Sequence, residues 1–223
     1  MTGYNFYLKK VLLGQIGGIV WITDSFSRQV AASADDIGVY KGTSAWGIQL
    51  TRTGEPMGRN SATLKRWGAG MRWLNVTIPK GATILTAHVH LIAFDTTTLV
   101  GINARIVGDL EANAAAFSTL ADYQARRGTS CDGADNTKRT VEQVDYAPET
   151  NWTQNVEYTT PDITLVIQEI VNQASWVSGN ALALFIDDHD DRTLSDNLER
   201  DSFSFNGSAA KAPTLHTTYK YIA

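Results

Sequence analysis

The sharpest chemical feature of the sequence is an acidic run that follows an apolar segment. Around His189 stand four aspartates, Asp187, Asp188, Asp190 and Asp191. Carboxylates this close repel one another, and a calcium ion, which takes six to eight oxygen ligands, would relieve that repulsion. The order of residues differs from that of an EF-hand loop. The run therefore predicts a structural calcium site as one of two alternatives.

The other alternative is that the protein neutralises the acidic run with its own cations. Arg192 and Arg200 follow the run closely in the sequence and could pair with its carboxylates. Water can solvate any carboxylate that remains, since exposed charges need no partner. The sequence leaves both alternatives open, and apart from calcium it indicates no cofactor.

Two histidines occupy alternate positions of a predicted strand. His88 and His90 share one strand face, a spacing that can place two imidazoles on one metal ion. A third ligand is absent from the nearby sequence. Because Ala87, Val89 and Leu91 would face the core, we expect the histidines at the surface or in an interface.

The six tryptophans suggest sugar binding, because aromatic faces stack on pyranose rings. Trp152, in the loop APETNWTQ, is the principal candidate, followed by Trp46 and Trp67. Each of the three could equally pack under a loop or in a subunit contact. Trp73 and Trp176 lie in apolar patterns that predict a place in the core.

The sequence carries no recognisable catalytic or nucleotide-binding motif. It has no G-x-S-x-G elbow, no P-loop and no dinucleotide fingerprint, so we expect no enzymatic activity. The net charge is −4 and no basic block occurs, which argues against nucleic-acid binding. The single cysteine, Cys131, cannot form an intrachain disulfide and is predicted to be a loop thiol.

The segment GMRWLNVTIPKGATILTAHVHLIAF, residues 70–94, must position the histidines and Trp73. Over 71–78 and again over 87–94, alternate residues fall on opposite faces in a period-two pattern, which is typical of strands. Between these runs, Pro79 and Gly81 indicate a tight turn. The pattern predicts an antiparallel hairpin.

The remaining elements complete a β-sandwich. Residues 162–175 have apolar residues at helical spacing and predict a helix, while 119–127 could form two helical turns capped by Ser118. The run NALALFIDD, residues 180–188, is apolar on both faces and predicts a central strand. We therefore expect an all-β, antiparallel jelly-roll sandwich with one covering helix at 162–175.

Residues 1–27 are expected to form an N-terminal arm, and residues 28–223 the sandwich domain. The apolar part of the arm is too short to span a membrane. An apolar arm outside a sandwich needs burial against its own domain or a neighbour, so we expect it to dock. The residues predicted to dock are Tyr4, Phe6, Tyr7, Leu12, Ile19 and Trp21.

Three segments in shared order resemble DNRLRE-type β-sandwich domains, which are similar to carbohydrate-binding modules of jelly-roll fold. They are RWLNVTIPKGATILTAHVHLIAF, TTPDITLVIQEIVNQASWVSGNALALFI and RDSFSFNGSAAKAPTLHTTY. SADDIGVYKG also resembles the opening strand of these domains. The resemblance covers roughly residues 29–219 and leaves the arm outside.

The resemblance implies a sandwich fold and a non-enzymatic role, and it brings no catalytic residues. Because similar domains occur in phage structural proteins, we expect a virion protein, either a capsid decoration or a tail or appendage component. Its arm would grip other virion proteins, and the chain would self-associate. The alternative is a carbohydrate-binding module of a secreted or cell-surface protein that binds a host glycan.

Overall fold

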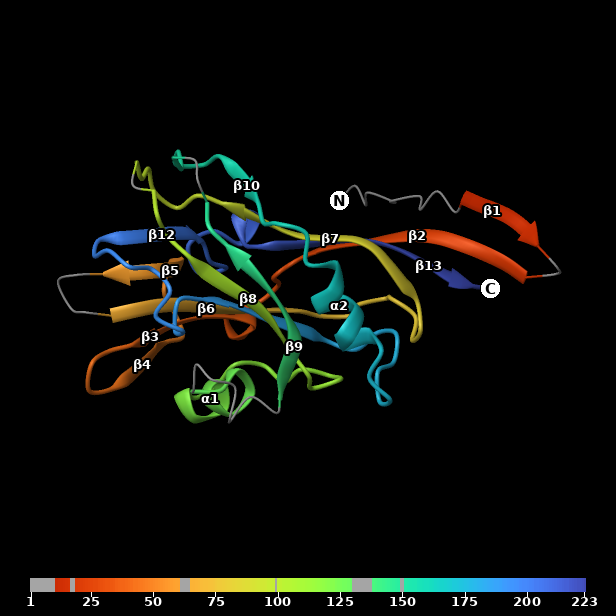
Figure 1. The fold of residues 1–223 in the computed structure, drawn as a ribbon, viewed down its shortest axis with the longest axis horizontal. Helices are drawn as coiled ribbons and strands as arrows, with labels where there is room; N and C mark the ends of the chain where they lie inside the picture. Colours follow the sequence, from red (N-terminus) through yellow and green to blue (C-terminus); the bar gives the residue numbers. More distant parts are fainter. Residues whose placement is uncertain (1–10, 17–18, 61–64, 99, 130–137, 149–150) are drawn as a thin grey trace, which may run out of the picture.

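The structure of the protein is a computed structural model. It describes residues 11–16, 19–60, 65–98, 100–129, 138–148 and 151–223. This part forms two antiparallel sheets packed as a sandwich with two short helices (Figure 1). The helices are α1 (Leu120–Arg127) and α2 (Thr164–Val171). The strands are β1 (Val11–Ile16), β2 (Ile19–Gln29), β3 (Asp36–Lys41), β4 (Trp46–Gln49), β5 (Gly54–Asn60), β6 (Lys65–Trp73), β7 (Thr83–Ile92), β8 (Ala104–Asp109), β9 (Arg139–Tyr146), β10 (Glu157–Thr159), β11 (Leu182–Asp187), β12 (Leu198–Phe203) and β13 (Thr214–Ile222).

One sheet has five strands in the order β1-β2-β13-β7-β10, and the other has eight. The larger sheet follows the order β12-β5-β6-β11-β8-β9, with β3 beside β6 and β4 beside β3. β5 and β11 share one edge of β6: β5 pairs with its residues 65–67 and β11 with residues 68–73. The predicted antiparallel sandwich is confirmed, and β11 is central, as its two apolar faces indicated.

The core between the sheets is built from the inward faces of both. Trp73 on β6 is fully buried, and so are Ala87, Val89 and Leu91 on β7. The alternation of β7 therefore predicted its inward face correctly. Trp176 also lies in this core, as expected, and donates its indole N–H to the carbonyl of Ile78.

The predicted hairpin at residues 70–94 is wrong, because β6 and β7 belong to different sheets. The connection at 74–82 crosses the end of the sandwich. Asn75 has a φ of 52°, and the side chains of Val76 and Ile78 beyond it are buried. Asn75 thus shifts the phase of the alternation, so that Trp73, Val76 and Ile78 all point into the core. The turn residues Pro79 and Gly81 indicate where the chain bends, and both hairpins and sheet-to-sheet crossings use such bends.

The helix predicted at 162–175 exists as the shorter α2, and Asp162 accepts the backbone N–H of Thr164 near its start. α2 packs against β7 of one sheet and against β8 and β9 of the other. The two helical turns expected at residues 119–127 exist as the second helix, α1. The Oγ of Thr119 accepts the N–H of Asp122, so Thr119 caps α1 in place of Ser118.

A second, smaller core covers the outer face of the eight-stranded sheet. Side chains of β3, β8 and β11 meet there with α1 and the segment before it. Its principal members are Ile37, Val39, Val107, Phe117, Tyr123 and Phe185. This core makes the eight-stranded sheet apolar on both faces near its centre, and it holds α1 close to the end of β11.

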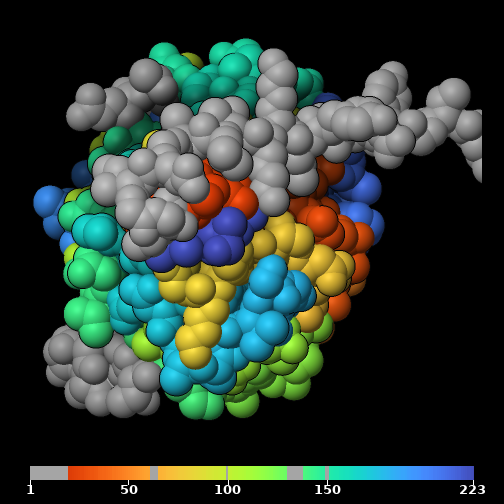
Figure 2. All heavy atoms as spheres, turned by 90° about the vertical axis from the view of Figure 1, so that its right-hand side faces the viewer, coloured from red at the N-terminus to blue at the C-terminus, as the bar shows by residue number. Residues whose placement is uncertain are grey.

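The described part of the predicted arm is an extension of the five-stranded sheet. β2 pairs with β13 from Trp21 to Gln29, so the expected boundary at 27/28 falls inside a paired strand. β1 pairs with residues 19–23 of β2, and in Figure 1 these strands run past the sandwich body. Figure 2 shows β2 and β13 emerging above the 74–82 connection at this end.

The six residues predicted to dock fall in three places. Tyr4, Phe6 and Tyr7 lie outside the described residues, whereas Leu12 and Ile19 belong to β1 and β2. Trp21, on β2, is 36% exposed and pairs in register with Ile222, which is 55% exposed.

We predict that deleting residues 1–18 leaves a folded protein, whereas deleting residues 1–27 does not. The shorter deletion removes β1 but keeps β2 beside β13. The longer one also removes Ile22 and Phe26, each 4% exposed, and removing one buried phenylalanine side chain typically costs about 3–5 kcal/mol. Circular dichroism with thermal unfolding measures both variants. Cooperative unfolding of the longer deletion at the midpoint of the full chain would contradict this arrangement.

Candidate functional site

The acidic run leaves the eight-stranded sheet where β5 replaces β11 beside β6. Asp187 is the last residue of β11 and pairs with Gly68, and the backbone N–H of Asp188 donates to the carbonyl of Trp67 at 3.1 Å. The loop after β11 therefore lies over the outer face of the sheet, next to Arg66 and the ends of β3 and β5.

Asp187 forms a buried, two-point ion pair with Arg127 of α1. Arg127 Nε donates to Oδ2 at 2.8 Å and Nη2 donates to Oδ1 at 2.6 Å, and both side chains are 1% exposed. Burial alone would raise the pKa of Asp187, but the charge and hydrogen bonds of Arg127 outweigh burial and lower that pKa to about 2. Asp187 is therefore ionised at any physiological pH.

The other three aspartates of the run also pair with arginines. Asp190 receives Arg127 Nη2 and Arg105 Nη1, each at 2.9 Å. Arg66 donates to Asp188 from Nη1 and to Asp191 from Nε, each at 2.8 Å. Neutralisation by arginine, the second alternative from the sequence, is therefore the arrangement observed.

The arginines named from the sequence were the wrong ones. The side chain of Arg192 pairs with Asp145, and that of Arg200 is buried on β12. Among the described residues, no group of three or more His, Cys, Asp or Glu side chains is placed to hold a metal ion. Cys131 lies outside the described residues.

His189, in the middle of the run, is a core residue. Its ring meets Trp46 edge-on at 4.7 Å between centroids, and its Nδ1 lies 3.4 Å from the hydroxyl of Tyr123. Burial lowers the pKa of His189 to about 4, so the ring is neutral at pH 7. This ring therefore contributes packing and hydrogen bonding at neutral pH, without a charge.

Two glycines of β6, which were not among the predicted site residues, leave space for this cluster. A Cβ on Gly68 would lie 2.1 Å from the Cβ of Asp187, and a Cβ on Gly70 would lie 2.7 Å from Phe117. Alternate glycines inside a strand mark a face that another group approaches closely. The segment WGAGM of β6 carried this signal.

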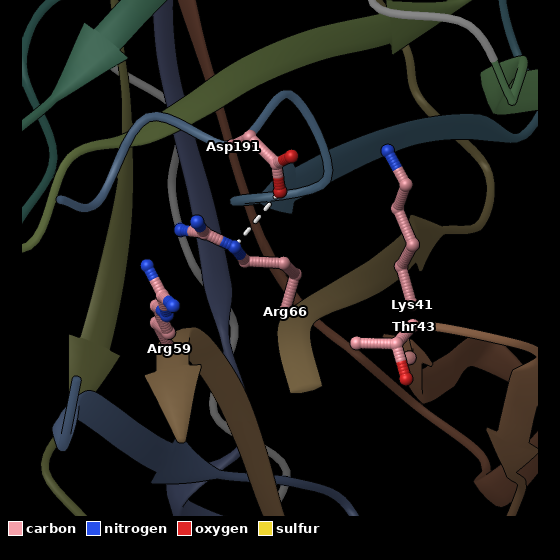
Figure 3. A pocket seen from close by; sticks show the side chains of 6 residues that line it. Lys41, Thr43, Arg59, Arg66 and Asp191 are labelled. Carbon is pink, nitrogen blue, oxygen red and sulfur yellow. Dashed lines mark ion pairs between the residues drawn. The ribbon is translucent and has the colours of Figure 1, made fainter. Parts of the chain in front are cut away.

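Beside the cluster is a pocket of about 300 Å³, and three of its six lining residues are cationic (Figure 3). Lys41, Arg59 and Arg66 line it together with Thr43 and Asp191. In Figure 3 Arg66 lies between Arg59 and Lys41, and a dashed line marks its ion pair with Asp191. The pocket had no signal in the sequence, because its cations come from three separate strands.

Three histidines gather on the outer face of the five-stranded sheet. His90 and His216 lie 4.1 Å apart between ring centroids, and His88 pairs in register with His216. His90 Nδ1 lies 2.7 Å from Glu157 Oε1, and His88 Nδ1 lies 3.1 Å from the carbonyl of Thr160. His88 and His90 are half-buried outside the core, as the alternation of β7 predicted.

Trp152, the principal candidate for sugar stacking, is fully buried and lies flat against Tyr158 at 4.9 Å between ring centroids. Its expected exposure was wrong, because the chain around it is tied down by two backbone hydrogen bonds with Thr97. Trp67 is 6% exposed and is covered by Arg52. Of the three candidates, only the half-buried Trp46 retains some open surface.

A separate group of buried carboxyls lies around β5. Glu55 is 1% exposed, and its Oε2 has no hydrogen-bond partner in the described part of the protein. Burial, reinforced by the charges of Asp36 and Asp201, raises the pKa of Glu55 well above its usual range. Burial likewise raises the pKa values of Asp36 and Asp201 to about 6.

No family model matches this chain, and no curated protein matches it either. The two-sheet sandwich is accordingly supported by the structure, and the finer family resemblance remains an expectation. None of the helices in the described ranges is long and apolar enough to cross a membrane.

We predict that Arg127→Met lowers the free energy of unfolding by about 3–5 kcal/mol, because it leaves Asp187 buried and unpaired. Denaturant titration measures the effect. Glu157→Gln, which breaks the exposed pair with His90, is the control, and we expect it to cost less than about 1 kcal/mol. Equal losses in the two variants would show that Arg127 has no special role.

We predict that Glu55→Gln stabilises the protein at pH 7.5 and has little effect at pH 4.5. The pKa of Glu55 is raised in the folded state, so its contribution to stability is complete below the unfolded pKa of about 4.3 and is lost as pH rises. The gain grows by up to ~1.4 kcal/mol per pH unit. Denaturant titration at both pH values measures it, and a gain that does not depend on pH would contradict the assignment.

Proposed function

We propose that the protein is a non-enzymatic structural component of a phage virion, a capsid decoration or a tail or appendage protein. In this proposal, the extension of the five-stranded sheet attaches the chain to other virion proteins, and the sandwich body is displayed outward. The observation that carries the proposal is this extension, in which β1 and the outer parts of β2 and β13 run past the sandwich body in the described part of the chain (Figure 1).

The extension has the properties of a docking surface. β7 pairs with β13 only as far as Lys220, so Tyr221 and Ile222 pair with β2 alone. Among the described strands β1 is an edge, and an unpaired edge offers backbone N–H and C=O groups to another chain. Trp21 and Ile222 add exposed apolar area at the same end.

The ion pairs of the acidic run at residues 187–191 support a non-catalytic role for that run. The four carboxylates of the 187–191 run are each engaged by an arginine, and Asp187 is held ionised by Arg127. A carboxylate committed to a buried pair is poorly placed to exchange protons with a substrate. The run therefore fits a structural role.

The alternative, a carbohydrate-binding module, has less support than the sequence indicated. Trp152 and Trp67 are buried, so neither presents a ring face on which a sugar could stack. A glycan array with the full chain tests this alternative. Binding of a neutral glycan that Trp46→Ala abolishes would favour it over the virion proposal.

We predict that the chain is present in purified virions from a culture that produces it. Density-gradient banding followed by mass spectrometry measures its amount against the major capsid protein. We expect a fixed stoichiometry that survives repeated banding. Recovery of the chain only in the soluble fraction, in several independent preparations, would contradict the proposal.

A pair of matched variants tests the docking surface. Trp21→Ala with Ile222→Ala removes the exposed apolar pair of the extension and should reduce incorporation into virions at least tenfold. Leu165→Ala with Leu194→Ala removes two exposed leucines elsewhere, at 61% and 87% exposure, and should leave incorporation unchanged. Equal incorporation of both double variants would place the attachment elsewhere.

A further inference from the structure

Three cationic side chains stand in one row across three neighbouring strands. Lys41 of β3 is in register with Arg66 of β6, and Arg59 of β5 is in register with Arg66 on its other side. Like charges placed directly opposite one another destabilise a sheet. Such a row requires anions to balance it, and the protein supplies only part of that balance from buried groups.

Arg66 is anchored from the protein side. Its Nη1 donates to Oδ2 of Asp188, whose side chain is fully buried, at 2.8 Å. A buried, charge-assisted hydrogen bond of this kind fixes the orientation of the guanidinium. The group is therefore already held in place before any ligand reaches the pocket.

The other two anions of the row are exposed. Asp191, which pairs with Arg66 Nε at 2.8 Å, has a side chain 60% exposed, and Asp196, which pairs with Arg59, has a side chain 41% exposed. Exposed ion pairs are worth about 0–1 kcal/mol, so a competing anion can replace their carboxylates. Asp191 lines the pocket itself, as Figure 3 shows.

We propose that this pocket binds a tetrahedral dianion, the phosphate or sulfate group of a small molecule or saccharide, and that Asp191 is its internal competitor. The carboxylates of Asp191 and Asp196 pair with Arg66 and Arg59 from exposed positions, and a dianion carries the same charge as the two carboxylates that it would displace. Arginine donors suit phosphate and sulfate oxygens, and the hydroxyl of Thr43 adds a further donor to the lining.

The size of the pocket bears on the source of the anion. About 300 Å³ exceeds what a phosphate group needs and falls at the lower end of the range for small-molecule sites. Free phosphate and a phosphorylated sugar therefore share the same anchoring chemistry here. They differ in whether the remaining volume contributes to affinity.

Isothermal titration calorimetry of the full chain tests the proposal, in a phosphate-free buffer of low ionic strength. The probes are inorganic phosphate, inorganic sulfate, glucose 6-phosphate and glucose. We expect binding of the anionic probes, weakened by added salt, and no binding of glucose. Glucose 6-phosphate binding at least tenfold tighter than phosphate would identify a saccharide source, and equal affinities would identify the free anion.

Three variants connect binding to the pocket. Asp191→Asn keeps a side chain that tolerates the φ of 58° at this position but removes the competing charge, so phosphate should bind about threefold more tightly. Arg59→Gln should weaken binding about tenfold. Lys80→Gln removes one positive charge from the 74–82 connection, away from the pocket lining, and should leave affinity unchanged.

Two results would overturn the proposal. One is the absence of binding by phosphate, sulfate and glucose 6-phosphate at concentrations up to about 10 mM. The other is binding that Arg59→Gln and Lys80→Gln weaken equally, with no gain in Asp191→Asn, because that pattern would reflect general charge attraction. Thermal unfolding of each variant confirms that the protein compared is folded.

Discussion

The buried ion pair between Arg127 and Asp187 is the contact on which the arrangement of the outer face depends. An eight-residue helix such as α1 is too short to be stable alone, so tertiary contacts must hold it. Arg127 fixes its last turn to the end of β11, and the neighbouring Arg126 pairs with Asp109 at the end of β8. The carboxylate of Asp187 also accepts the backbone N–H of His189, which lies in the loop that reaches the cationic pocket.

The molecule has two parts: a sandwich body, in which the sheets are covered, and the extension of the five-stranded sheet, which we call the open end. In the body, both faces of the eight-stranded sheet are covered near its centre. The carboxylates of the acidic run form ion pairs with Arg66, Arg105 and Arg127. At the open end, β1, β2 and β13 continue past the second sheet (Figure 1). If the chain attaches through this end, as proposed, the body with its pocket would stay accessible to a small ligand.

The sequence predicted what depends on local pattern. The buried face of β7, the central place of β11 and both helices follow from alternation, apolar runs and helical spacing. The hairpin prediction failed because one residue in the left-handed region, Asn75, changed the phase of the pattern, and turn residues do not say which sheet the chain enters. The arginine partners of the acidic run were missed because they lie on β6, β8 and α1, and no spacing rule connects them.

We infer that the ion pairs with Arg66, Arg105 and Arg127 suffice to hold the acidic run of residues 187–191 together, so that it needs no calcium ion. Thermal unfolding of the full chain in about 5 mM EDTA and in about 5 mM calcium chloride tests it directly, because an ion that binds only the folded state raises its melting temperature. We predict midpoints that agree within about 1 °C. A midpoint several degrees higher in calcium, abolished when Asp188 and Asp190 are changed to asparagine, would contradict the claim.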